Sequence, residues 1–176
     1  MIIDVKDLMR MSEFSNMDET VLQRKLDAVE ELVRVYTNNN FQNRKVRFLA
    51  PSENGKVVGW SEYLKKGDTI EINNSINDGL YVVQKMNRVG HTIELDKELY
   101  SAPDNLITKV EYPASVIDGV INLLQWDVQN RSKVGIQSET LSRHSVTYFA
   151  QDASNQLMGY PVTLLGFLKP YIKARF

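Results

Sequence analysis

Residues 67–95 read GDTIEINNSINDGLYVVQKMNRVGHTIEL, and this stretch decides the fold of the middle of the chain. Ile70 and Ile72 alternate with polar neighbours, which is the two-residue period of a β-strand. Asn-Asp-Gly at 77–79 favours a tight turn, because these residues accept the backbone conformations that turns require. The run 80–86 has the length and the β-branched content of a second strand. The pattern predicts short antiparallel strands joined by tight turns.

The same short alternation extends well beyond this stretch on both sides. Val46, Phe48 and Ala50 alternate before Pro51, and Asn-Gly at 54–55 is typical of a two-residue hairpin turn. Further strand candidates lie at 56–60, 91–95 and 106–112. Five or six strands at this spacing predict a small β-barrel, or a strongly bent antiparallel sheet, over residues 45–112.

Helical periodicity flanks the β segment. Residues 4–11 predict a short helix, and residues 18–37 predict a longer one that Asp18 can cap. Residues 113–131, which begin at the helix-favouring Pro113, predict a third helix with a wide apolar stripe. Gly119 within it costs about 1 kcal/mol relative to Ala, and close approach of another helix is the expected compensation. The stripe of the 18–37 helix consists of Leu22, Leu26, Val29, Val33 and Tyr36.

A last short apolar helix is predicted after Pro161, and Pro170 is expected to stop or kink it. Neither flanking stretch can bury its apolar stripe alone, so residues 1–44 and 113–176 are predicted to pack together as a helical bundle. The predicted fold class is therefore α+β: a helical bundle with residues 45–112 inserted as a small β-barrel or bent antiparallel sheet.

The composition is that of an ordinary globular protein. The chain has 176 residues, a net charge of −1 and no cysteine, which excludes disulfides and thiolate chemistry. A net charge near zero argues against a general polyanion binder. No apolar run approaches the roughly 20 residues of a membrane-spanning helix, and the acidic N-terminal residues differ from those of a signal peptide. We expect a protein that folds in solution.

No motif for catalysis or for metal or cofactor binding is visible in the sequence. The two histidines, His91 and His144, lie in unrelated contexts, and without cysteine a zinc site is not expected. His91 is expected at a turn or on the surface. Ser142 and Ser145 flank His144, but a triad depends on spatial geometry rather than on adjacency in sequence. Three acids lie at turns or on the polar face of a strand, where solvation explains them: Asp68, Glu71 and Asp78. We expect a non-enzymatic protein without a cofactor or metal ion.

Aromatic and basic residues occur together in the β segment, and small barrels can bind nucleic acid with that mixture. The aromatic residues are Trp60, Tyr63, Tyr81 and Tyr100, and the basic residues are Lys56, Lys65, Lys66, Lys85 and Arg88. The simpler interpretation is core aromatics with an ordinary charged rim, which the near-zero net charge favours. A nucleic-acid-binding module that uses the β insertion is the alternative hypothesis.

Several phrases resemble the head–tail connector, or adaptor, family of long-tailed bacteriophages. The segment GIQSETLSRHSVTYF (135–149) is similar to the family phrase S-E-x-I-G-x-x-S-V-x-Y, and LKPYIK (168–173) is similar to its terminal Leu-x-x-Tyr-basic phrase. The matching residues are Ser138, Glu139, Leu141, Ser145, Val146, Tyr148, Leu168, Tyr171 and Lys173. The β segment resembles the SH3-like small barrels of phage neck and tail proteins, through Gly67, Asp68, Ile70, Ile72, Ser75, Asn77, Gly79, Tyr81 and Val83.

The resemblance implies a structural adaptor: a ring of identical subunits between the portal and the downstream stopper, neck or tail protein. Such a ring would extend the DNA channel without sequence-specific binding and would lie at the head–tail interface of the virion after assembly in the host cytoplasm. The acid-free C-terminal segment is expected to dock on the portal, through Leu168, Lys169, Tyr171, Lys173, Arg175 and Phe176. The 132–147 loop and its surroundings are expected to face a neighbouring subunit or the channel, through Arg131, Lys133, Ser138, Glu139 and Arg143.

Overall fold

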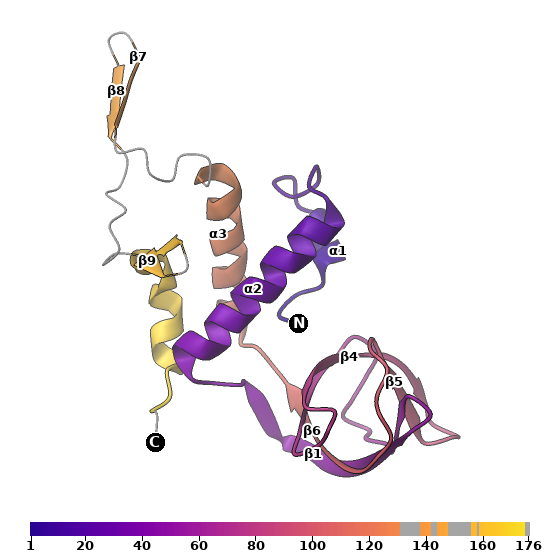
Figure 1. Ribbon diagram of the computed structural model, residues 1–176. Helices are drawn as coiled ribbons and strands as arrows, with labels where there is room; N and C mark the ends of the chain where they lie inside the picture. The colour runs from indigo at the N-terminus through magenta and orange to yellow at the C-terminus, as the bar shows by residue number, and fades with distance from the viewer. Residues whose placement is uncertain (131–137, 142–143, 148–155, 158, 175–176) are drawn as a thin grey trace. The chain divides into compact units, whose positions relative to one another are not determined.

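The computed structural model describes residues 1–130, 138–141, 144–147, 156–157 and 159–174. The fold is α+β, with a closed six-stranded antiparallel barrel and several helices (Figure 1). The chain divides into two compact units. The barrel unit consists of Met1 and Asn39–Tyr112, and the helical unit consists of Ile2–Asn38 and Pro113–Phe176.

Six strands form the barrel: β1 (Gln42–Glu53), β2 (Lys56–Val58), β3 (Thr69–Asn73), β4 (Gly79–Asn87), β5 (Thr92–Leu95) and β6 (Ala102–Val110). They follow the order β1-β2-β5-β4-β3-β6, and β6 closes the barrel by pairing antiparallel with β1. The sequence predicted that the β segment begins at residue 45. It begins earlier, because Gln42 already pairs with Val110 in the β1–β6 ladder.

The Asn-Gly turn between β1 and β2 is confirmed. Glu53 pairs with Lys56, so only Asn54 and Gly55 form the loop. Both have positive φ angles, 51° and 78°, as a tight hairpin turn of this length requires. The preceding strand β1 continues through Pro51, where the β1–β6 register shifts between Ala50 and Ser52. A proline lacks the N–H that a regular ladder needs, so a bulge is the position at which a strand tolerates it.

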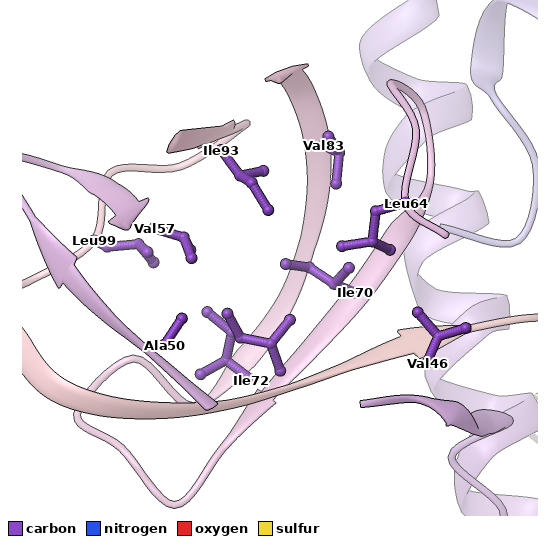
Figure 2. Close-up of a cluster of buried hydrophobic side chains, with 10 residues drawn as sticks. Val46, Ala50, Val57, Leu64, Ile70, Ile72, Val83, Ile93 and Leu99 are labelled. Carbon is purple, nitrogen blue, oxygen red and sulfur yellow. The ribbon is translucent and has the colours of Figure 1, made fainter. Parts of the chain in front are cut away.

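The barrel core is built mainly from apolar side chains of the six strands, and Leu64 and Leu99 from the connecting segments complete it (Figure 2). Its buried members are Val46, Ala50, Val57, Leu64, Ile70, Ile72, Val83, Ile93, Leu99 and Ile107.

The expectation that Glu71 is solvated is wrong. Glu71 is buried, and its carboxylate accepts hydrogen bonds from Gln42 Nε2 at 2.7 Å and Asn40 Nδ2 at 3.1 Å. These donors offset the cost of removing a carboxylate from water.

A buried amide network supports one end of the barrel. Asn77 Nδ2 donates to the Tyr100 carbonyl at 2.9 Å and to Asn105 Oδ1 at 3.0 Å. Asn77 Oδ1 accepts from the Tyr100 N–H at 2.8 Å. Asn105 donates in turn to the Ala50 carbonyl and to Ser52 Oγ. The loop before β4 is therefore fixed to β1 and to the segment before β6 by satisfied polar groups.

The two ends of the barrel unit are joined in a stem. The Glu111 N–H donates to the Phe41 carbonyl at 2.9 Å, directly beyond the Gln42–Val110 pair. The rings of Phe41 and Tyr112 lie 4.8 Å apart between centroids. The chain thus enters and leaves the barrel through adjacent backbone segments.

The helical unit contains α1 (Val5–Met9), α2 (Glu19–Thr37), α3 (Ala114–Asn130) and the 3-10 helix η2 (Val162–Tyr171). It also contains two hairpins, β7 (Ser138–Leu141) with β8 (His144–Thr147) and β9 (Gln156–Leu157) with β10 (Tyr160–Pro161). The predicted N-cap of α2 is confirmed, because Asp18 Oδ1 accepts from the Val21 N–H at 3.0 Å. Asn38 ends α2 in the left-handed conformation with φ 47°. The stripe residues Leu22, Leu26, Val29 and Val33 are all buried.

The close approach expected at Gly119 is confirmed. α3 packs on η2, and a Cβ atom placed on Gly119 would lie only 2.4 Å from Cδ2 of Phe167. No side chain larger than glycine fits there without displacing that ring. The last helix differs from the prediction in one respect: η2 is a 3-10 helix that continues past Pro170 to Tyr171.

An ion pair joins two helices of this unit. Lys25 on α2 donates to the carboxylate of Asp127 on α3, whose side chain is buried. In the described part of the chain, none of the helices has the length and apolar character needed to cross a membrane.

Candidate functional site

The predicted docking segment at the C-terminus divides into core and surface residues. Leu168 is fully buried in the helical unit, so its side chain belongs to the core and cannot contact a partner in this conformation. Lys169 and Lys173 are exposed, and Tyr171 is half-buried. Arg175 and Phe176 lie outside the described residues. The candidate surface in this segment is therefore formed by Lys169, Tyr171 and Lys173.

The end of η2 and the residues after it are fixed to neighbouring helices. The Tyr171 and Ser115 hydroxyl groups lie 2.6 Å apart and share a hydrogen bond. The Lys173 N–H donates to the Thr37 carbonyl at 2.8 Å, and Asn38 Nδ2 donates to the Ala174 carbonyl at 3.0 Å. These bonds occupy groups at the C-terminal end of α2, where positive charge is also favoured by the helix dipole. Among the described residues, the ammonium groups of Lys169 and Lys173 have no ion-pair partner.

The second predicted set lies mostly outside the described part of the chain. Arg131, Lys133 and Arg143 are not described. Ser138 and Glu139 belong to β7, in which they pair with Thr147 and Val146 of β8. Residues 145–149 of the sequence predict a short strand, and the structure places β8 at His144–Thr147. The pairing strand β7 was missed, because four residues give too short an alternation to be recognised.

A concave surface on the barrel unit was not predicted as a set. It has a cavity volume of about 510 Å³ and is lined by Trp60, Ser61, Glu62, Tyr63, Arg88 and His91. These residues come from the segment after β2 and from the β4–β5 hairpin. The two segments are held together because the Gly59 N–H donates to the His91 carbonyl at 2.7 Å. His91 is exposed at a turn with φ 47°, as expected from the sequence.

Only part of the aromatic and basic mixture noted in the sequence reaches this surface. Trp60, Tyr63 and Arg88 line it. Lys56 instead pairs with Glu94 at 2.9 Å, and its hydrogen bond lowers the pKa of that carboxyl. Tyr81 is a structural residue: its hydroxyl donates to the Asn77 carbonyl at 2.9 Å, and burial raises its pKa.

The electrostatics of the concave surface are mixed. Glu62 raises the pKa of the Tyr63 hydroxyl, chiefly because the carboxylate accepts a hydrogen bond from it. The Arg88 guanidinium and the Trp60 indole N–H make no hydrogen bond within the described part of the chain. The barrel unit from 39 to 112 contains ten Lys and Arg against ten Asp and Glu. The concave surface thus presents several hydrogen-bond donors, and residues 39–112 as a whole carry no net charge.

No cluster in the described residues brings together three His, Asp or Glu side chains that could hold a metal ion. The Ser52–Asn77–Asn105 network is buried and its hydrogen bonds are internal, so it supports the barrel and presents no group to a ligand. No protein-family model matches the sequence, and no curated protein matches it significantly.

Proposed function

We propose that the protein is a structural adaptor of a tailed-phage neck. In this proposal, identical subunits form a ring between the portal and the downstream stopper, neck or tail protein. The ring extends the channel through which genome DNA passes. The protein assembles in the host cytoplasm and becomes part of the virion at the head–tail interface.

One observation carries the proposal beyond the resemblance of short sequence phrases. The barrel is a complete insertion: its first and last strands pair, and its stem brings Phe41 and Glu111 together. This arrangement suits an adaptor in which a helical bundle forms the scaffold of the ring and an inserted module reaches a separate partner. In a ring of identical subunits, one face of each subunit contacts a different face of the next subunit. Each subunit therefore needs two different, complementary faces.

The charge distribution supports a docking role for the end of the helical unit. After Asp152 the chain contains no acidic residue, while Lys169, Lys173 and Arg175 are basic. The first two are exposed and lack an ion-pair partner among the described residues. An acidic groove on a portal would complement them. The net charge of −1 also suits a channel wall along which DNA slides without being held.

The test is co-purification with a cognate portal protein. Deleting residues 161–176 would remove Leu165 and Leu168 from the core, so point variants are required. We expect the double variant Lys169→Glu, Lys173→Glu to bind the portal roughly tenfold more weakly, because each exposed ion pair contributes up to about 1 kcal/mol.

The matched control is Lys65→Glu, Lys66→Glu, which reverses two exposed charges on the barrel unit. It should bind the portal like the unchanged protein. Equal binding by the Lys169/Lys173 variant would remove the docking assignment. Absence of any ring when protein and portal are mixed and viewed by electron microscopy would remove the adaptor function itself.

The nucleic-acid alternative predicts salt-dependent binding of DNA or RNA by the barrel unit. Its equal numbers of acidic and basic residues give no sequence-independent attraction to phosphate, which is the main source of such binding. We therefore retain the adaptor as the function that the residues support best.

A further inference from the structure

The concave surface on the barrel has a composition unlike that of an ordinary charged rim. Two aromatic residues and one arginine, Trp60, Tyr63 and Arg88, line the same hollow. Tyr63 is 65% exposed although it is large and mostly apolar. Trp, Tyr and Arg are the residues most enriched at the energetic centres of protein interfaces. The hollow is therefore a candidate for recognition of a partner.

Its hydrogen-bonding groups are mainly unused donors. The Arg88 guanidinium carries five N–H donors in a planar fork, and neither it nor the Trp60 indole N–H has a partner in the described residues. The lining contains one carboxylate, that of Glu62. A ligand must consequently supply acceptors, and a carboxylate matches the guanidinium fork in two parallel hydrogen bonds.

The same hairpin also presents an uncovered apolar side chain. Val89 follows Arg88 directly and is 97% exposed. A ligand that places an apolar group beside its carboxylate would cover Val89 or an aromatic face while it pairs with Arg88. Peptide segments offer this combination, whereas a nucleic-acid strand would bring a series of phosphates to a unit with ten acids and only ten bases.

We propose that this hollow binds a protein segment that presents an Asp or Glu carboxylate next to an apolar side chain. Arg88 pairs with the carboxylate, Trp60 donates to it or stacks on the segment, and Tyr63 packs against the apolar group. This inference concerns the barrel alone and does not depend on the adaptor function.

The chain contains only two tryptophans, Trp60 on the barrel unit and Trp126 in α3. Their indole N–H resonances give a site probe and an internal control in one spectrum of the full-length protein, with a Trp126→Phe variant for assignment. The probes are the capped dipeptides Ac-Leu-Glu-NH2 and Ac-Leu-Gln-NH2, and an eight-residue oligothymidylate. We expect the glutamate peptide to shift the Trp60 resonance saturably and to leave Trp126 unchanged. The glutamine peptide should bind about tenfold more weakly, because it loses the charged hydrogen bonds.

The variant Arg88→Gln should abolish the difference between the two peptides. The matched control is Lys85→Gln, which removes an exposed cation from β4 outside the hollow. This variant should still bind the glutamate peptide more tightly than the glutamine peptide. Unchanged backbone amide resonances of the barrel unit outside the hollow verify that each variant keeps the barrel fold. Equal binding of both peptides, or an unaltered preference in Arg88→Gln, would overturn the proposal. Saturation by oligothymidylate at concentrations where the glutamate peptide gives no shift would show that the ligand is nucleic acid and would equally overturn it.

Discussion

In the barrel unit, strands that are far apart in sequence are joined edge to edge, and a buried amide network fixes their ends. In the helical unit, order comes from local caps and from apolar stripes that meet at a few close contacts, such as Gly119 with Phe167. A closed ladder satisfies its backbone groups through tertiary pairing, whereas each helix satisfies its own. The two units should therefore respond differently to loss of a side chain.

The largest effect is expected for Leu168→Ala in the helical unit. Removing a fully buried leucine side chain costs about 2–5 kcal/mol, because apolar contacts are lost and a cavity remains. Urea unfolding followed at the indole resonances should show an earlier transition at Trp126 and an unchanged one at Trp60. Leu164 lies on the same 3-10 helix and is exposed, so Leu164→Ala is the control and should change little. A single transition at both tryptophans would show that the units unfold together.

A smaller loss, about 1–3 kcal/mol, is expected for Asn77→Ala in the barrel, because one buried donor loses its partner. The substitution leaves the Tyr100 N–H without its hydrogen-bond partner, whereas the Tyr100 carbonyl still accepts from Ser52 Oγ and Asn105 Oδ1 still accepts from Ser75 Oγ. Here the Trp60 transition should move and the Trp126 transition should stay. Ser101→Ala, at an exposed neighbouring position, provides the control. A loss below about 0.5 kcal/mol would mean that the network contributes little to the stability of the barrel.

The comparison between two glycines tests the helix contact. Gly119→Ala gains about 1 kcal/mol of helix propensity. It must displace the Phe167 ring, and overpacking of this kind costs about 1–3 kcal/mol, so a net loss near 1 kcal/mol is expected. At Gly166 nothing lies within 4 Å of an added Cβ, and Gly166→Ala should be nearly neutral. Stabilisation by Gly119→Ala in thermal unfolding would contradict the close packing of α3 on η2.

The smallest effect concerns pH and the barrel. Burial alone would raise the pKa of Glu111, but hydrogen bonds from Lys109 and Asn43 and the nearby positive charges outweigh it and lower that pKa. A carboxyl with a lowered pKa stabilises the fold above its unfolded-state pKa, and this contribution is lost as the pH falls through the folded-state value. Glu111→Gln should cost at most about 1 kcal/mol at pH 7, because the group is half-exposed, and less near pH 3 as the carboxyl takes up a proton. Urea midpoints at the two pH values measure it, and a difference that persists at low pH would contradict the ion pair.

Local structure was predictable where a short pattern determines it. Asn54 and Gly55 form the expected turn, and Asp18 caps α2. Gly119 lies where a helix approaches closely, as its cost in a helix implied. Each of these depends on neighbours within a few residues or on one steric requirement.

Features that depend on barrel closure were not predictable from one sequence. Glu71 has the spacing of a solvent-facing residue, yet Gln42 and Asn40 cover it once β1 and β3 lie on either side of β6. The concave surface likewise joins Trp60 to His91, which are far apart in the chain. Apolar spacing alone could not tell that Leu168 faces the core rather than a partner, because one short helix offers two apolar sides.

The stem at Phe41 and Glu111 affects how such a protein can evolve. The barrel begins and ends at adjacent backbone positions, Phe41 and Glu111. The two chain ends that the barrel connects are therefore as close together as the ends of a tight turn. A short loop could replace the barrel at this position at little entropic cost, since the entropy of loop closure changes slowly with loop length. We therefore expect that residues 39–112 can be removed or exchanged as one segment while the helical unit keeps its fold.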